Sequence, residues 1–260
     1  MSWYLLPALL IVGLVSLSIL CFFWIRNVTN QKQLKEDQEI ISYALNTISL
    51  FYCVLVGLVV IDVQSERDDV QEVIVKEAAI LMEMYHTANS FDFIKADAVN
   101  TAIHQYAITA LQTELPLMEK EPDFAHLHYI HTDKLWQALR TIHPADYQQL
   151  AVYQKILDNM TQLTDARFKR FSSIGGRTTT FLWVILIYGG ILVIACSLMF
   201  ASKSRLSHAV HLSFNVSLIS LILFLIYALD SPFIGPTAVS MTAFEKVIRH
   251  IDVEGETRDT

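Results

Sequence analysis

Cysteine is scarce in this sequence, and no two cysteines have a spacing typical of a metal site or a redox pair. Cys21, Cys53 and Cys196 lie far apart, each in an apolar segment, so we interpret them as small buried side chains. A glycine-rich phosphate loop, an HExxH pair and a GxSxG elbow are missing as well. Nothing in the sequence therefore supports an enzyme, and we expect neither catalytic residues nor a cofactor.

An excess of basic residues is also lacking. The formal net charge is -7, and the bases are interspersed with acids, so we expect no nucleic-acid partner. Charged residues make up only 17% of the chain and hydrophobic residues 53%. This composition is too apolar for an ordinary soluble domain of 260 residues and predicts an integral membrane protein.

Four segments are long and apolar enough to cross a bilayer, which takes roughly 20 residues of helix. They are Trp3 to Ile25, Ile40 to Ile61, Phe181 to Ala201 and His208 to Leu229. The first lacks the basic start and the A-x-A site of a cleaved signal peptide. We therefore predict four transmembrane helices.

The polar insert between the second and third spans shows helical periodicity throughout. Its apolar residues recur at intervals of three and four, as in the stripe Val70, Ile74, Leu81 and Met84, and no segment alternates like a strand. We predict an all-α membrane protein with transmembrane hairpins at 1–62 and 181–230, a helical extramembrane domain at 63–180, and a turn, an amphipathic helix and a tail at 231–260.

The second span carries a strip of small or polar residues. We name Ser42, Asn46, Ser49, Cys53 and Gly57 the α-strip, because intervals of three and four place them on one helix face. Such a strip can pack closely against another helix or can face water in a pore. In the second case Val56, Gly57 and Val60 would form an apolar constriction.

The fourth span ends in the sequence LDSPFIGP. Asp230 follows the last apolar residue, where a carboxylate costs little. Pro232 stops the helix, Phe233 follows it, and Gly235 permits a tight turn. We expect a structural turn in which Asp230 tethers the chain.

Histidines suggest two further candidates. His126, His128 and His131 could hold zinc or nickel if their loop folded around an ion, but no matching ligand pair exists elsewhere, so we predict no metal site. His208 lies near a headgroup region and is interpreted as an interfacial residue. Asn215, deeper in the fourth span, must find a hydrogen-bond partner.

Basic residues flank the spans on both sides, with eight on the side of the insert, including Arg167 and Arg170, and five on the other. This count favours an insert on the cytoplasmic side of the plasma membrane. Long loops are partly exempt from the rule, however, and the first span has bases only after it, which favours the opposite orientation with the N-terminus outside.

Several segments carry a family resemblance. The sequences KEAAILMEMYHTA, YAITALQTELPLM, LTDARFKRF and LDSPFIG, the last followed by VSMTAFEKVI, together with the second span, make the chain similar to the bestrophin-like family of bacterial integral membrane proteins. Ser231 departs from this family, which usually has a basic or aromatic residue there. The resemblance extends over nearly the full length and implies distant kinship with the bestrophin ion channels.

The resemblance implies a homo-oligomer, most simply a pentamer, in which the second span lines a pore for small ions such as chloride. Its partners would be copies of itself, membrane lipids and ions. A second hypothesis stays open, in which the spans anchor a scaffold or sensor whose insert binds a protein or ligand without conduction.

Overall fold

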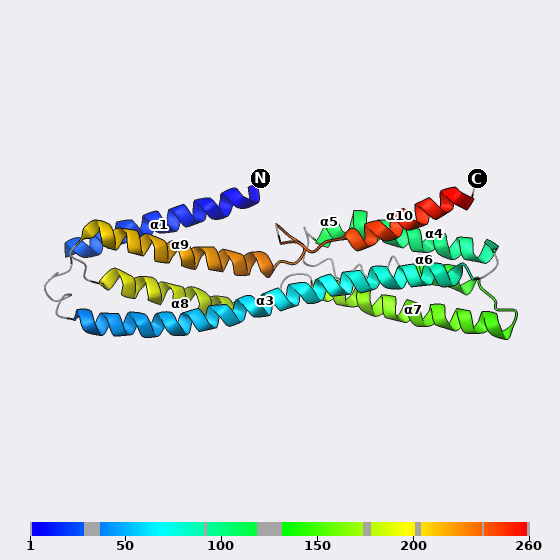
Figure 1. The fold of residues 1–260 in the computed structure, drawn as a ribbon, viewed down its shortest axis with the longest axis horizontal. Helices are drawn as coiled ribbons and strands as arrows, with labels where there is room; N and C mark the ends of the chain where they lie inside the picture. Colours follow the sequence, from blue (N-terminus) through cyan, green and yellow to red (C-terminus); the bar gives the residue numbers. More distant parts are fainter. Residues whose placement is uncertain are drawn as a thin grey trace. The chain divides into compact units, whose positions relative to one another are not determined.

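A computed structural model describes residues 2–28, 37–90, 93–118, 132–173, 178–200, 204–235 and 237–258. Within these ranges every regular element is a helix (Figure 1), which confirms the all-α prediction. The chain divides into two compact units, one formed by residues 1–65 and 177–230 and the other by residues 66–176 and 231–260.

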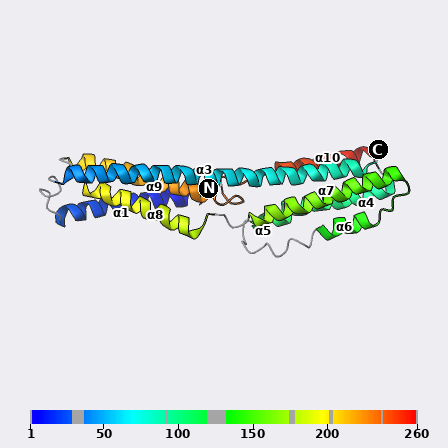
Figure 2. The same ribbon diagram turned by 90° about the horizontal axis from the view of Figure 1, so that it is seen from below.

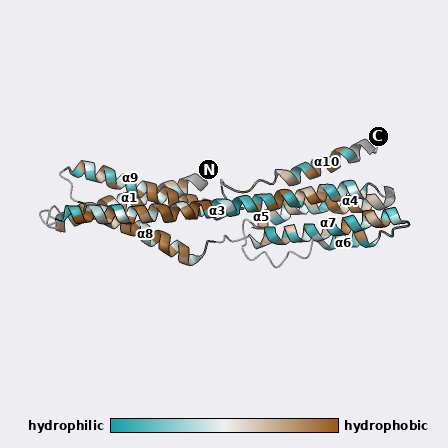
Figure 3. Cartoon of the chain, turned by 60° about the horizontal axis from the view of Figure 1, so that its bottom comes forward, coloured by the Kyte–Doolittle hydropathy of each residue, from teal (hydrophilic) through white to brown (hydrophobic). Residues whose placement is uncertain are grey.

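The first unit contains four helices that are long and apolar enough to cross a membrane. They are α1 (Ser2–Val28), the first part of α3 (Gln38–Ala88), α8 (Thr180–Met199) and α9 (Arg205–Leu229). Helix α9 packs against both α1 and α8, and Figure 3 shows that hydrophobic residues dominate these helices. The four predicted spans are thus present, and the protein is an integral membrane protein.

Few side chains are buried in this unit. One cluster joins α3 to α8 and α9 through Val56, Val59, Leu186 and Ile226, and another joins α1 to α9 through Phe22. Most large apolar residues on these helices remain exposed. That is expected for spans, since hydrocarbon solvates them and only helix-to-helix packing buries side chains.

The second unit is built on the remainder of α3. It also contains α4 (Phe93–Thr109), α6 (Thr132–Arg140), α7 (Tyr147–Ser172) and α10 (Thr242–Arg258). Figure 2 shows α7 running along α3 and α6 farther from it, where α6 packs against α4. Its core includes the predicted stripe on α3 and residues such as Ile103, Met160 and Phe244. Helix α10 contacts α4, so the predicted amphipathic helix packs on the insert.

One segment of this unit departs from regular α-helix. Residues Ala110–Glu114 form a π-helical turn, η1, followed by α5 (Leu115–Met118). A proline has no N–H and interrupts regular helical hydrogen bonding, so a widened turn just before Pro116 agrees with the sequence.

The chain after α9 makes an ordered turn. Gly235 has φ 88°, a conformation that glycine adopts without strain, and the N–H of Val239 donates to the carbonyl of Pro232 at 2.8 Å. Phe233 is buried in the core of the second unit. This segment is further held to α3, because Gln71 exchanges two hydrogen bonds with the backbone of Ser240, at 2.6 and 3.0 Å.

Candidate functional site

The α-strip lies partly open on the surface of the single chain. Asn46, Cys53 and Gly57 are exposed, and Ser42 and Ser49 are half-buried. The prediction that the cysteines are buried is wrong, because Cys53 is exposed and Cys21 and Cys196 are only partly buried. No atom outside its own helix lies within 4 Å of the position that a Cβ would take on Gly57. The hydroxyl of Ser42 donates to the carbonyl of Gln38 at 2.8 Å, so its proton is used within the helix.

The residues expected at a constriction separate in the structure. Val56 is only 5% exposed and packs with Val59 and Leu186 inside the protomer. Val60 is half-buried at the edge of that cluster, and Gly57 is exposed. Neighbouring residues on a helix diverge by about 100°, which explains why Val56 and Gly57 face different surroundings.

A close contact fixes a neighbouring face of α3, about 100° around the helix from Cys53. The ring of Tyr52 lies over Gly189 and Gly190 of α8, where a Cβ on Gly189 would come within 2.7 Å of Tyr52 Cδ2. Only glycine allows the two helices to approach this closely. This packing holds α3 against α8 with the α-strip pointing elsewhere.

Asp230 connects the ends of two spans. Its Oδ1 accepts hydrogen bonds from the hydroxyl of Thr178 at 2.6 Å and from the Thr178 N–H at 3.1 Å. Since α8 begins at Thr180 and α9 ends at Leu229, these bonds join the start of one span to the end of the other.

The other end of α9 carries a polar cluster. His208 is 4% exposed, packs edge-on against Phe22 and contacts the carbonyl of Ser197 through Nε2 at 2.9 Å. It is therefore buried between helices, and its place at the headgroup level stays a prediction. Asn215 finds its partners in the Ser197 hydroxyl and in His211, each at 3.2 Å.

The second unit encloses a cluster of four charged side chains that sequence reasoning missed. We name Glu77, Glu114, Arg167 and Arg170 the charge cluster; each is at most 2% exposed. Arg170 donates to Glu77 through Nε at 2.7 Å and Nη2 at 3.0 Å, and to Glu114 through Nη2 at 2.7 Å. Arg167 donates to Glu114 at 2.6 Å. Two carboxylates and two guanidinium groups balance to zero net charge.

Aromatic rings surround the charge cluster. Tyr106 donates its hydroxyl proton to Glu77 at 2.6 Å, and the Arg167 guanidinium lies 5.3 Å from the centre of its ring. Burial, reinforced by the negative charge of Glu77, raises the pKa of Tyr106 well above its usual value. Burial opposes the charge on Arg170, but Glu77 and Glu114 outweigh it and raise the pKa of that guanidinium.

The cluster lies within family segments. KEAAILMEMYHTA contains Glu77, YAITALQTELPLM contains Tyr106 and Glu114, and LTDARFKRF contains both arginines. A charge at a position where helical periodicity demands an apolar residue was the available signal. Glu77, for example, falls between Ile74 and Leu81 on the buried stripe of α3.

The described part of the chain contains no group of three His, Cys, Asp or Glu residues placed to hold a metal ion. His126, His128 and His131 lie outside the described residues.

Comparisons with known proteins identify the family. A family model described as Bestrophin-like domain matches residues 12–244. The fold is similar to the crystal structure of a mutant form of a bacterial Bestrophin homolog from Klebsiella pneumoniae, with a TM-score of 0.63 and 11% identity, covering 95% of this chain and 98% of that chain. Crystal structures of two point mutants of a membrane protein are similar at a TM-score of 0.64 and 12% identity, covering 96% of this chain and 98% of each of those. Among curated protein sequences, none matches the chain. Because the family match extends over most of its length, the chain belongs to the Bestrophin-like family.

Proposed function

We propose that this protein is one subunit of a homo-oligomeric ion channel, a pentamer, in which the α-strip of each subunit faces a central pore. The observation that carries the proposal is the exposure of Asn46 and Cys53 on a membrane-spanning helix. An amide facing hydrocarbon is unfavourable because it has no hydrogen-bond partner there. Water in a shared pore, or a neighbouring subunit at its wall, would satisfy the amide.

Membership in the Bestrophin-like family supports the same proposal, since the bestrophins that this chain resembles are channels. A ring of identical subunits gives each α3 the same environment and closes without free interfaces. The family likewise favours transport over catalysis.

We place the constriction of the proposed pore at Gly57 and Val60. Val56 packs inside the protomer, and a substitution there would alter packing more than permeation. A narrow apolar segment can close a pore by losing its water. Val60→Thr, which keeps the shape but adds a hydroxyl, should therefore increase current through a closed channel. Val54→Thr serves as the matched control, because Val54 is 56% exposed and lies about 80° from Asn46 around the helix.

Small ions are the proposed permeant species. The α-strip contains no acid or base and offers the Asn46 amide and the Ser49 hydroxyl as donors, so we propose that anions such as chloride pass. We also propose that the insert lies in the cytoplasm of a cell with this protein in its plasma membrane. Two of the eight bases on the insert side, Arg167 and Arg170, are neutralised in the charge cluster, but the remaining six still outnumber the five opposite.

Planar-bilayer recording of the purified oligomer tests conduction directly. Discrete currents whose reversal potential follows the chloride gradient would support the proposal. Intact oligomers without current across pH and voltage would contradict it.

The alternative of a membrane-anchored scaffold or sensor rests on the insert, which has its own core. Chemical crosslinking in membranes separates the two functions. A ladder ending at five subunits favours the channel, and a monomer or dimer joined to one specific partner favours the scaffold.

A further inference from the structure

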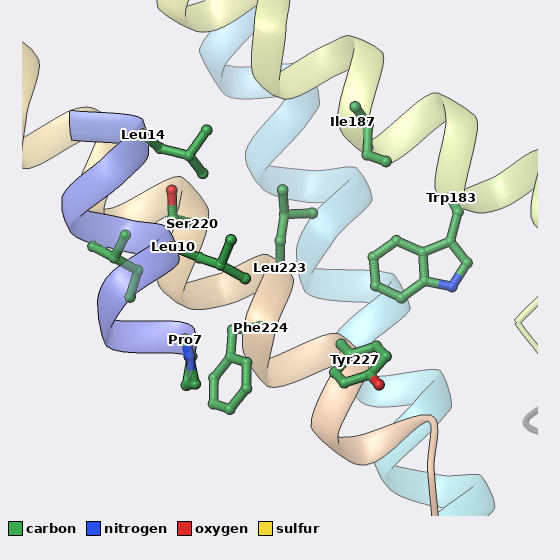
Figure 4. Close-up of a pocket in the computed structure, with 10 residues that line it drawn as sticks. Pro7, Leu10, Leu14, Trp183, Ile187, Ser220, Leu223, Phe224 and Tyr227 are labelled. Atoms are coloured by element: carbon green, nitrogen blue, oxygen red, sulfur yellow. The ribbon is translucent and has the colours of Figure 1, made fainter. Parts of the chain in front are cut away.

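A groove of about 620 Å³ opens on the membrane-spanning unit. Its walls come from α1, α8 and α9 (Figure 4). The volume is within the range of known small-molecule sites, which is about 300–1,000 Å³. The lining is almost wholly apolar, and Leu10, Leu14 and Ile187 are each close to half exposed or more. The groove is therefore open at the protomer surface.

The polar atoms of the groove are unevenly distributed. Trp183 lies in the first turn of α8 and Tyr227 in the last turn of α9, and Figure 4 shows the indole nitrogen and the phenol oxygen towards the same end of the groove. Leu14 and Ser220 lie towards the other end. Ser220 precedes Tyr227 by two helical turns, or about 10 Å along the axis.

This arrangement matches the polarity of a lipid. Tryptophan and tyrosine at the ends of spans lie at the level of the lipid headgroups, with their N–H and O–H groups towards water. From there the groove runs inward over apolar side chains for about 10 Å, roughly two thirds of the hydrocarbon depth of one leaflet. A phospholipid places its ester and headgroup oxygens at this level, where they can accept from the indole N–H and the phenol O–H at the mouth.

The groove also lies away from the proposed pore. Within the described part of the chain, α3 supplies none of its lining residues, whereas the α-strip lies on α3. An acyl chain from the bilayer could therefore occupy the groove without contacting the α-strip. We propose that this groove binds one acyl chain of a membrane phospholipid, with the ester and headgroup region beside Trp183 and Tyr227.

Quenching of tryptophan fluorescence by brominated acyl chains tests this proposal. The full-length protein would retain Trp183 alone, with its three other tryptophans changed to phenylalanine, in vesicles of phosphatidylcholine with brominated chains. We expect strong quenching of Trp183, and loss of most of that quenching when Ser220→Phe fills the groove. Leu10→Phe is a second filling variant, should the first fail to fold.

A control tryptophan on the open bilayer surface gives the comparison. Val184 follows Trp183 on α8, is 58% exposed and does not line the groove. In the variant Val184→Trp with Trp183→Phe, quenching should be strong and should not respond to Ser220→Phe. The proposal is overturned if Trp183 escapes quenching while the control is quenched, because a second copy of the chain then covers the groove. It is equally overturned if neither filling variant protects Trp183. Neither result depends on whether the protein conducts ions.

Discussion

Replacing Arg170 with glutamine should destabilise the insert by about 3–5 kcal/mol, the usual cost of removing one partner from a buried ion pair. Three N–H···O contacts of 2.7–3.0 Å connect Arg170 to Glu77 and Glu114, and these carboxylates are 0% and 1% exposed. Without the guanidinium the charge cluster changes from neutral to a net charge of -1. The other guanidinium of the charge cluster, that of Arg167, already donates to Glu114, so the excess negative charge stays buried without a new partner.

Denaturant unfolding followed by fluorescence measures this loss. Trp136 packs against the core of the second unit, so a variant with Trp136 as its sole tryptophan reports on the insert and not on the spans. Lys169→Gln is the matched control, because Lys169 is exposed on the same helix; it should change stability by about 0.5 kcal/mol or less. The double variant Arg170→Gln with Glu77→Gln should be more stable than Arg170→Gln alone, since it restores neutrality.

A loss below about 1 kcal/mol for Arg170→Gln would refute this reasoning, because it would mean that water reaches the two carboxylates. An equal loss for Lys169→Gln would also refute it.

Two further substitutions test other contacts. Tyr106→Phe removes a hydrogen bond to the Glu77 carboxylate and should cost about 1.5–3 kcal/mol. Burial raises the pKa of Tyr106, so its hydroxyl stabilises the fold fully below the pKa of an unfolded tyrosine, 10.0, and this stabilisation is lost as the pH rises above that value. The stability difference between Tyr106→Phe and the wild type should therefore shrink above pH 10.0. A difference that stays constant through pH 11, roughly one unit above that pKa, would count against the buried geometry. Gly189→Ala places a methyl group 2.7 Å from Tyr52 and should cost about 1–3 kcal/mol of stability in thermal unfolding of the spans. Gly13→Ala is the control and should cost nothing, because no atom lies within 4 Å of the added methyl group. Equal effects at the two positions would contradict the close packing.

The spans could be predicted because membrane crossing needs only length and apolar composition. A run such as residues 205–229 has no other stable surroundings than hydrocarbon. The helical insert followed from periodicity in the same way. The turn after α9 was foreseen in kind, since Pro232 and Gly235 have few conformational options, but its hydrogen bonds to Gln71 depend on a residue far away in sequence.

The charge cluster could be predicted only in part. Periodicity places Glu77 on the buried stripe of α3, but it does not identify its partners, and the positive-inside count treated Arg167 and Arg170 as solvated flanking bases. Whether such a residue is buried depends on partners that only the tertiary fold supplies, here Glu77 from α3 and Glu114 from η1. Val56 was predicted to lie at the constriction but is buried in the protomer. The sequence shows a wide small and apolar face on the second span, but it does not show which side of that face the neighbouring helices cover.

Aqueous accessibility of Cys53 tests the channel proposal most directly. With Cys21 and Cys196 changed to serine, Cys53 is the sole thiol of the chain and lies exposed in the α-strip. The control carries Val54→Cys with Cys53→Ser, which moves the thiol to an exposed position on an adjoining face of α3. If the α-strip faces a water-filled pore, a membrane-impermeant thiol reagent will modify Cys53 in intact vesicles and reduce the current, and it will leave the control thiol unmodified. Equal protection of both thiols, or modification of the control alone, would contradict the pore.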